Sequence, residues 1–84
     1  MRQLEVEEMA KENECMIIIG GKHSSNSNKL NEISKTYCDN TFFIENINDL
    51  NVKDLRNFKS IGIMAGASTP KDIIDEVYNR LIEE

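Results

Sequence analysis

The sequence predicts a small three-layer α/β/α domain, in which helices cover both faces of a parallel sheet of about three strands in a Rossmann-like arrangement. Three observations predict this fold class. Short runs of apolar and β-branched residues alternate with longer stretches of helical periodicity. One run, Met16–Ile19, is apolar without interruption, which is typical of a strand buried on both faces of a sheet. The length of 84 residues suits a single domain, so residues 1–84 are expected to form one α/β lobe.

The first three elements are a helix at 2–12, a strand at about 15–19 and a helix from about 26 to 37. The first helix is predicted from one apolar stripe among acidic residues, formed by Leu4, Val6, Met9 and Ala10. The second helix has its own stripe at helical spacing, formed by Leu30, Ile33 and Tyr37.

The middle of the chain is predicted to contain a strand, a loop and a short helix. Residues 41–44 are β-branched and aromatic, which favours a strand. Residues 45–51 are expected to form a polar loop. Asn51 and Asp54 stand at the spacing of a capping box, so a short helix through 52–57 is expected after that loop.

The last two elements are a strand at 61–65 and a helix from about 70 to 83. Pro70 suits the first helical position, with Thr69 or Ser68 as the N-cap before it. The apolar face of this helix consists of Ile74, Val77, Tyr78 and Leu81. Because the first helix has no strand before it, we expect this lobe to lack an upstream strand.

Charge and cysteine content exclude several function classes. Ten basic and fifteen acidic residues give a net charge of −5, which argues against a nucleic-acid surface. No apolar run approaches the length of a membrane span, so no membrane partner and a cytoplasmic location are expected. Cys15 and Cys38 are too few to form a metal site. Cys15 is expected to be a small buried residue.

Two polar turns follow predicted strands, at Gly20–Asn28 and Gly66–Pro70. The carboxyl ends of parallel strands meet at one edge of a sheet, where ligands of open α/β folds bind. Free N–H groups and the positive end of a helix dipole favour an anion there, and a phosphate or diphosphate is the expected guest. The candidate donors are the side chains of Ser24, Ser25, Asn26 and Ser68.

The alternative is that these residues only cap helices, as Ser and Asn do in many proteins. Neither turn matches a Walker A or a G-x-G-x-x-G pattern. Lys22 could reach an anion or remain a solvated surface residue. His23 is the only histidine in the chain and is expected to shape the turn.

The motifs in these turns resemble those of the 4-hydroxy-3-methylbut-2-enyl diphosphate reductases, the LytB family, once described as penicillin-tolerance proteins. The family pattern Val-Gly-X-X-X-Ser-Ser-Asn-(Ser/Thr)-X-(Lys/Arg)-Leu corresponds to residues 19–30, and Ala-Gly-Ala-Ser-(Thr/Ala)-Pro corresponds to residues 65–70. Arg2-Gln3, followed by Glu5-Val6, also resembles a family helix. The resemblance spans essentially the whole chain.

The resemblance implies the C-terminal third of an oxidoreductase built from three similar lobes around an iron–sulfur cluster (4Fe-4S). Such an enzyme reduces an allylic diphosphate alcohol in the last step of non-mevalonate isoprenoid biosynthesis. The family's serine-serine-asparagine turn and its second serine bind the substrate diphosphate. Carried over, these positions are Ser24, Ser25, Asn26 and Ser68.

Neither Cys15 nor Cys38 aligns with the family's cluster-ligating cysteines, and the catalytic glutamate has no counterpart. We therefore expect no cofactor in this chain itself, no catalytic residue and no activity without the other lobes, which would be its partners. The alternative is a stand-alone phosphate- or diphosphate-binding or regulatory module without redox activity. A generic Rossmann-like fragment with ordinary capped helices would show no saturable diphosphate binding.

Overall fold

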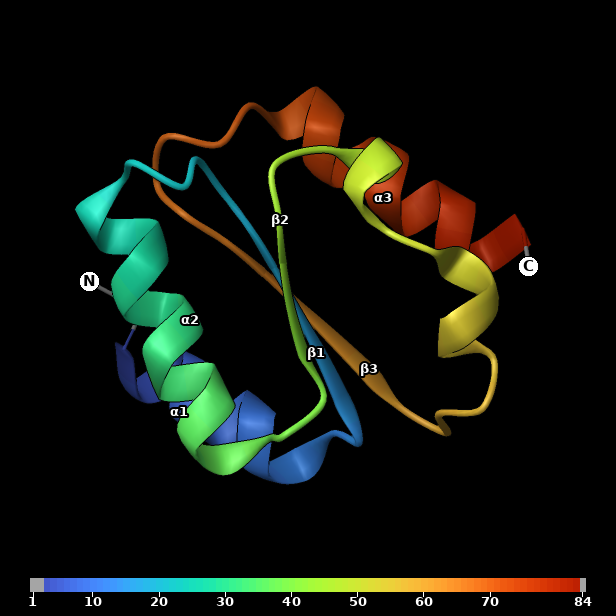
Figure 1. Ribbon diagram of the computed structural model, residues 1–84, viewed down its shortest axis with the longest axis horizontal. Helices are drawn as coiled ribbons and strands as arrows, with labels where there is room; N and C mark the ends of the chain where they lie inside the picture. The colour runs from blue at the N-terminus through green and yellow to red at the C-terminus, as the bar shows by residue number, and fades with distance from the viewer. Residues whose placement is uncertain (1–2, 84) are drawn as a thin grey trace.

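The observed elements follow the predicted alternation of helices and strands (Figure 1). The computed structural model describes residues 3–83, so Arg2 lies outside the described residues. The strands fall at the predicted bounds. The elements are α1 (Gln3–Glu12), β1 (Cys15–Ile19), α2 (Ser25–Tyr37), β2 (Thr41–Ile44), the 3₁₀ segments η1 (Ile47–Asp49) and η2 (Val52–Leu55), β3 (Ile61–Ala65) and α3 (Lys71–Glu83).

The three strands form one parallel sheet in the order β2-β1-β3. Met16 lies opposite Thr41 on one side and opposite Gly62 on the other, so β1 is the central strand. All five residues of β1 are buried, as the uninterrupted apolar run predicted. The α/β class and the parallel sheet are therefore confirmed.

The two faces of the sheet are covered by different helices. Figure 1 shows α1 and α2 on one side of the strands, and α3 with the 3₁₀ segments on the other. Alternate side chains of β1 supply the two cores: Met16 and Ile18 pack with Val6 and Leu30. Cys15, Ile17 and Ile19 point the other way and pack with residues that include Leu55 and Val77.

The prediction of a polar loop at 45–51 is wrong for residues 47–49, which form η1. Ile47 is buried and joins the core beneath α3, so this segment has an apolar anchor. Asn46 and Asp49 form a reciprocal capping box: the Asn48 N–H donates to Asn46 Oδ1 at 2.9 Å, and Asp49 Oδ2 accepts from the Asn46 N–H at 3.4 Å. Two buried side chains, Ile47 and Leu50, and a well-capped turn are enough to order this stretch.

The short helix predicted at 52–57 is a 3₁₀ segment that ends at Leu55. Asn51 does cap it, since its Oδ1 accepts from the Lys53 N–H at 3.2 Å. Val52 and Leu55 are both buried, three positions apart. A 3₁₀ turn places residues three positions apart on one side, so a single turn buries both side chains. Longer 3₁₀ runs are uncommon because their side chains eclipse one another.

The start of the last helix differs from the prediction by one residue. The helix begins at Lys71, and the Pro70 carbonyl accepts from the Ile73 and Ile74 N–H groups at 3.2 and 3.5 Å. Thr69 does not cap it, because its hydroxyl instead donates to the Ile19 carbonyl at 3.0 Å. The hydroxyl that the sequence assigned to the helix therefore connects the turn to β1.

The apolar stripes extend beyond the surface that the sheet covers. Leu4, Tyr37 and Tyr78 are 68%, 43% and 55% exposed, although each was predicted on a buried face. Periodicity identifies the side of a helix but not how far a three-stranded sheet reaches beneath it. Within residues 3–83, no helix has the length and apolar content needed to cross a membrane.

Candidate functional site

The two polar turns meet at one edge of the sheet. Gly20 N–H donates to the Ile44 carbonyl at 2.9 Å, and Gly66 N–H donates to the Ile19 carbonyl at 3.0 Å. These bonds continue the parallel ladders past the ends of β1 and β3. The chain thus leaves two neighbouring strands at the same edge, which confirms the arrangement expected from the motifs.

The edge is also the point at which the chain turns toward opposite faces of the sheet. From β1 it enters α2 on one face, and from β3 it enters α3 on the other (Figure 1). In open α/β sheets this geometry leaves a crevice between neighbouring turns, where ligands bind. For the strand order β2-β1-β3, this rule assigns the candidate crevice to the ends of β1 and β3.

One side-chain hydrogen bond joins the two turns directly, and a second joins the Ser68 turn to the end of β1. Asn26 Oδ1 accepts from the Ala67 N–H at 3.2 Å, and Thr69 Oγ1 donates to the Ile19 carbonyl at 3.0 Å. With its oxygen engaged, Asn26 has its amide N–H₂ available as a donor. Together these hydrogen bonds hold the serine-rich turn, residues 20–28, against the Ser68 turn, residues 66–70.

Ser24 is the N-cap of α2, since its hydroxyl oxygen accepts from the Ser27 N–H at 3.3 Å. The capping interpretation of this serine is therefore correct, but its own O–H proton remains available. Ser25 is exposed at the first helical position, one residue before the predicted start. The N–H groups of Ser25 and Asn26 have no partner within the described part of the chain. Unpaired N–H groups of this kind attract anions.

The serine-rich turn is braced from within by Asn28. Its amide donates to the Lys22 carbonyl at 2.7 Å and to the Ser24 carbonyl at 2.9 Å. Sequence reasoning assigned Asn28 no role beyond a polar residue of the turn. Lys22 and His23 are both exposed at the surface of this braced loop.

A shallow concavity of about 260 Å³ adjoins the Ser68 side of the edge. Gly20, Gly21, Ser68 and Thr69 contribute to its wall, and so does Glu45. Sequence reasoning missed Glu45, although it follows β2 directly and must therefore reach the same edge. Its carboxylate places one negative charge beside the predicted anion site.

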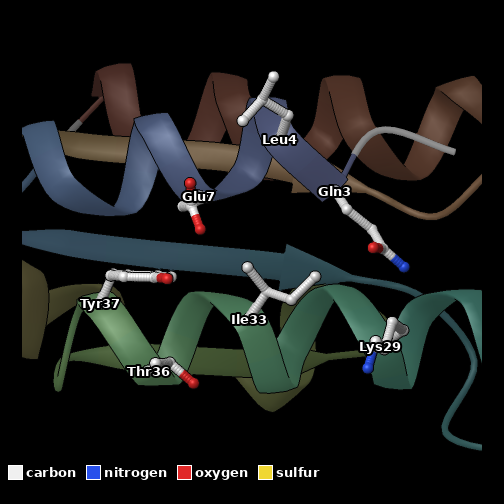
Figure 2. Close-up of a pocket in the computed structure, with 7 residues that line it drawn as sticks. All are labelled: Gln3, Leu4, Glu7, Lys29, Ile33, Thr36 and Tyr37. Carbon is white, nitrogen blue, oxygen red and sulfur yellow. The ribbon is translucent and has the colours of Figure 1, made fainter.

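A larger concavity, of about 510 Å³, lies elsewhere, in the groove between α1 and α2. Figure 2 shows Glu7 of α1 and Ile33 and Tyr37 of α2 between the two helices. None of the predicted site residues belongs to this concavity. Two of its polar side chains interact with each other, since a hydrogen bond to Glu7 raises the pKa of Tyr37. Lys11, on the adjoining surface of α1, lies 4.7 Å from the Tyr37 ring centre.

The cysteines of this chain do not fit an iron–sulfur cluster. Cys15 and Cys38 are buried in cores on opposite faces of the sheet. Burial, with a smaller contribution from Cys38, raises the pKa of Cys15 to about 12. Clusters bind thiolates, which this environment disfavours. Among residues 3–83, no three His, Cys, Asp or Glu side chains are grouped so that they could hold a metal ion.

Comparison with known proteins gives one consistent result. The family model described as LytB protein matches residues 1–82. The 4-hydroxy-3-methylbut-2-enyl diphosphate reductase of Alkaliphilus oremlandii is 51% identical over 81 residues, which are 95% of this chain and 29% of that protein. The enzyme of the same name from Clostridioides difficile is 51% identical over 80 residues, 95% of this chain and 28% of its own length.

Solved structures agree with the sequence comparison. The structure of (E)-4-hydroxy-3-methyl-but-2-enyl diphosphate reductase, described as the terminal enzyme of the non-mevalonate pathway, superposes with a TM-score of 0.92 at 46% identity and covers 99% of this chain and 30% of that one. The corresponding reductase of Plasmodium falciparum gives a TM-score of 0.87 at 26% identity, with 95% and 25% covered. The chain thus spans less than a third of the length of these relatives.

Proposed function

Since the chain belongs to the LytB protein family, we propose that it is the diphosphate-binding lobe of a 4-hydroxy-3-methylbut-2-enyl diphosphate reductase. In this role it binds the diphosphate end of an allylic substrate. The donors are the hydroxyls of Ser24, Ser25 and Ser68, the Asn26 amide, and the free N–H groups at the start of α2.

The observation that carries the proposal is the joining of the two turns. Each turn alone has the composition of an ordinary helix cap. The hydrogen bond from Ala67 to Asn26 joins the two turns, and the bond from Thr69 to Ile19 fixes the Ser68 turn to the end of β1. A diphosphate has two phosphoryl groups, so two neighbouring sets of donors match its length better than one. Uncharged donors suit a chain whose overall charge is −5.

The proposal assigns the redox chemistry to other parts of such an enzyme. The buried cysteines do not fit the cluster, and the relatives that match are more than three times longer than the matched region. The 84-residue chain should therefore bind the anion without reducing a substrate. The cluster and the remaining lobes would be partners of this lobe.

A titration with inorganic pyrophosphate, followed by backbone amide NMR, tests the proposal. Saturable shifts are expected at residues 21–28 and 67–69. The double variant Ser25→Ala/Ser68→Ala should weaken binding and keep the fold, because each hydroxyl contributes about 0.5–1.5 kcal/mol net and more toward a charged acceptor. Ser60→Ala is the matched control, since Ser60 lies at the opposite edge, where its hydroxyl accepts from the Glu14 N–H at 3.0 Å.

Unchanged affinity in the double variant would place the pocket elsewhere. A flat titration with a well-dispersed spectrum would refute anion binding by the isolated lobe. The second candidate is a stand-alone phosphate- or diphosphate-binding or regulatory module without redox activity. The buried cysteines agree with it as well as with the reductase lobe, because neither places a cluster on this chain. Activity of the same chain together with the remaining lobes of a reductase would support the first candidate against the second.

A further inference from the structure

Ser27 lies where the first turn of α2 rests on the ends of β1 and β3. Its side chain is completely buried, and within the described residues its hydroxyl has no hydrogen-bond partner. Buried hydroxyls in folded proteins are nearly always paired. Since Ser27 makes no such bond, the role of its side chain here is one of volume and position.

The Ser27 side chain occupies space that is open only because residues 20 and 66 are glycines without a Cβ. A Cβ at Gly20 would overlap the Ser27 hydroxyl and lie 2.6 Å from the Ser27 Cβ, and a Cβ at Gly66 would overlap the same hydroxyl. By contrast, a Cβ at Gly21 would meet nothing within 4 Å. None of the described glycines has a positive φ, so the backbone conformation does not require glycine at these positions. The requirement comes from contact with Ser27.

These contacts place one side chain between the two turns of the candidate site. Gly20 begins the serine-rich turn, and Gly66 begins the turn that carries Ser68. The neighbouring residue, Asn26, is the one that accepts from the Ala67 N–H. A change in the distance between Ser27 and either glycine therefore changes the distance between the two sets of donors.

We infer that Ser27 is a positioning residue of the anion site: its side chain, lodged against Gly20 and Gly66, sets the separation of the serine-rich turn from the Ser68 turn. It acts through the donors on both sides and does not itself contact the anion. The part of this inference that concerns ligand binding rests on the proposed function. The part that concerns the coupling of the turns does not.

A complementary pair of substitutions tests the inference in the 84-residue chain. Gly20→Ala should weaken pyrophosphate binding by about tenfold or more, because small displacements of positioned groups are costly. No rotation of the Ser27 side chain relieves this collision, since the Cβ itself is too close. Ser27→Gly in the same chain removes the colliding atoms and should restore most of the affinity.

The matched control is Gly20→Ala combined with Ser34→Gly. Ser34 lies on the same helix and is equally buried, but it contacts Thr41 at the other end of the helix. The control carries the same cost of a helical glycine and should restore nothing. Equal recovery with Ser27→Gly and Ser34→Gly, or unchanged binding in folded Gly20→Ala, would overturn the inference.

A second substitution keeps the test valid if Gly20→Ala fails to fold. Gly66→Ala is milder, because its Cβ would lie 3.4 Å from the Ser27 Cβ and only the hydroxyl must move. Without ligand, the changes in backbone amide chemical shift that Gly66→Ala causes should extend from its own turn to residues 24–26. These changes should become smaller when Ser27→Gly is added. Shifts confined to residues 65–69 would overturn the inference. A flat pyrophosphate titration of the wild type would refute the proposed function instead.

Discussion

The two buried serines of α2 provide a sharp test of how hydroxyl pairing affects stability. Both Ser27 and Ser34 are completely buried on the same helix. Thr41 Oγ1 donates its proton to the Cys38 carbonyl at 2.7 Å, so the 2.9 Å contact between Ser34 and Thr41 must be donated by Ser34. The Ser27 hydroxyl has no hydrogen-bond partner among residues 3–83. The same substitution, Ser→Ala, should therefore have opposite effects at the two positions.

Ser34→Ala removes a paired hydroxyl and should lower the free energy of unfolding by about 1 kcal/mol. Ser27→Ala removes a buried hydroxyl that has already lost its hydration, so the free energy of unfolding should stay the same or rise by up to about 1 kcal/mol. Alanine is the better helix former by a similar amount at both positions, which largely cancels in the comparison. The expected difference between the variants is about 1–2 kcal/mol.

Urea unfolding followed by circular dichroism measures this difference directly. In thermal unfolding, each kcal/mol of difference between the two variants corresponds to a difference in Tm of about 4–8 °C for a domain of this size. Equal destabilisation by the two substitutions would show that the Ser27 hydroxyl is as well paired as that of Ser34. That result would refute the reasoning that assigns Ser27 a steric role.

Three further outcomes are expected. Glu45→Gln should strengthen pyrophosphate binding by about two- to fivefold at low salt and less at high salt, because it removes an exposed negative charge beside the site; isothermal titration at two ionic strengths measures this. Gly62→Ala should lower the urea midpoint without changing pyrophosphate affinity, since its Cβ would lie 2.6 Å from Met16 Sδ and 2.9 Å from Asn13 Nδ2, away from the crevice. The buried Cys15 thiol, with its pKa raised to about 12, contributes stability that is fully present below pH 9 and is lost as the pH rises toward about 12. Cys15→Ala should therefore reduce the fall in unfolding free energy with rising pH, measured by urea unfolding across this range. An unchanged dependence on pH would contradict the burial argument.

The strands and the meeting of the two turns at one edge of the sheet could be predicted because both depend on local pattern. The apolar run at 16–19 has no polar residue, and a run of that kind is stable only between two covered faces. Parallel strands align their carboxyl ends, so the location of both turns follows once the alternation of helices and strands is recognised. These inferences need no knowledge of how distant side chains pack.

The errors occurred where two local patterns compete. Asn46 and Asp49 stand at the same spacing as Asn51 and Asp54, but the reciprocal capping box was predicted at the second pair and is observed at the first. Both segments bury apolar residues, Ile47 in the first and Val52 and Leu55 in the second, so the local pattern does not distinguish the two pairs. Thr69 illustrates the same limit, because the carbonyl that its hydroxyl reaches belongs to a distant strand.

The role of Ser27 was hidden from the sequence for a related reason. Gly20 and Gly66 suggest flexible turns, and only their negative φ angles and their distance from Ser27 show that they are required for space. Glu45 was accessible in principle, since it follows a predicted strand. The motifs of the two turns indicate hydrogen-bond donors, and the Glu45 carboxylate, an acceptor outside both turns, does not belong to them. Which donors bind an anion is a question for the pyrophosphate titration.

The pairing of β1 with β3 also affects how the chain acquires its site. These strands are neighbours in the sheet but are separated along the chain by α2, β2 and both 3₁₀ segments. Parallel pairing of distant segments forms slowly, because the chain loses the entropy of loop closure before the stabilising contacts between the strands form. The crevice between the two turns therefore exists only after the last strand has docked. If the lobe binds an anion there as proposed, the anion would bind only the fully folded chain, and the unfolding midpoint would rise with the anion concentration.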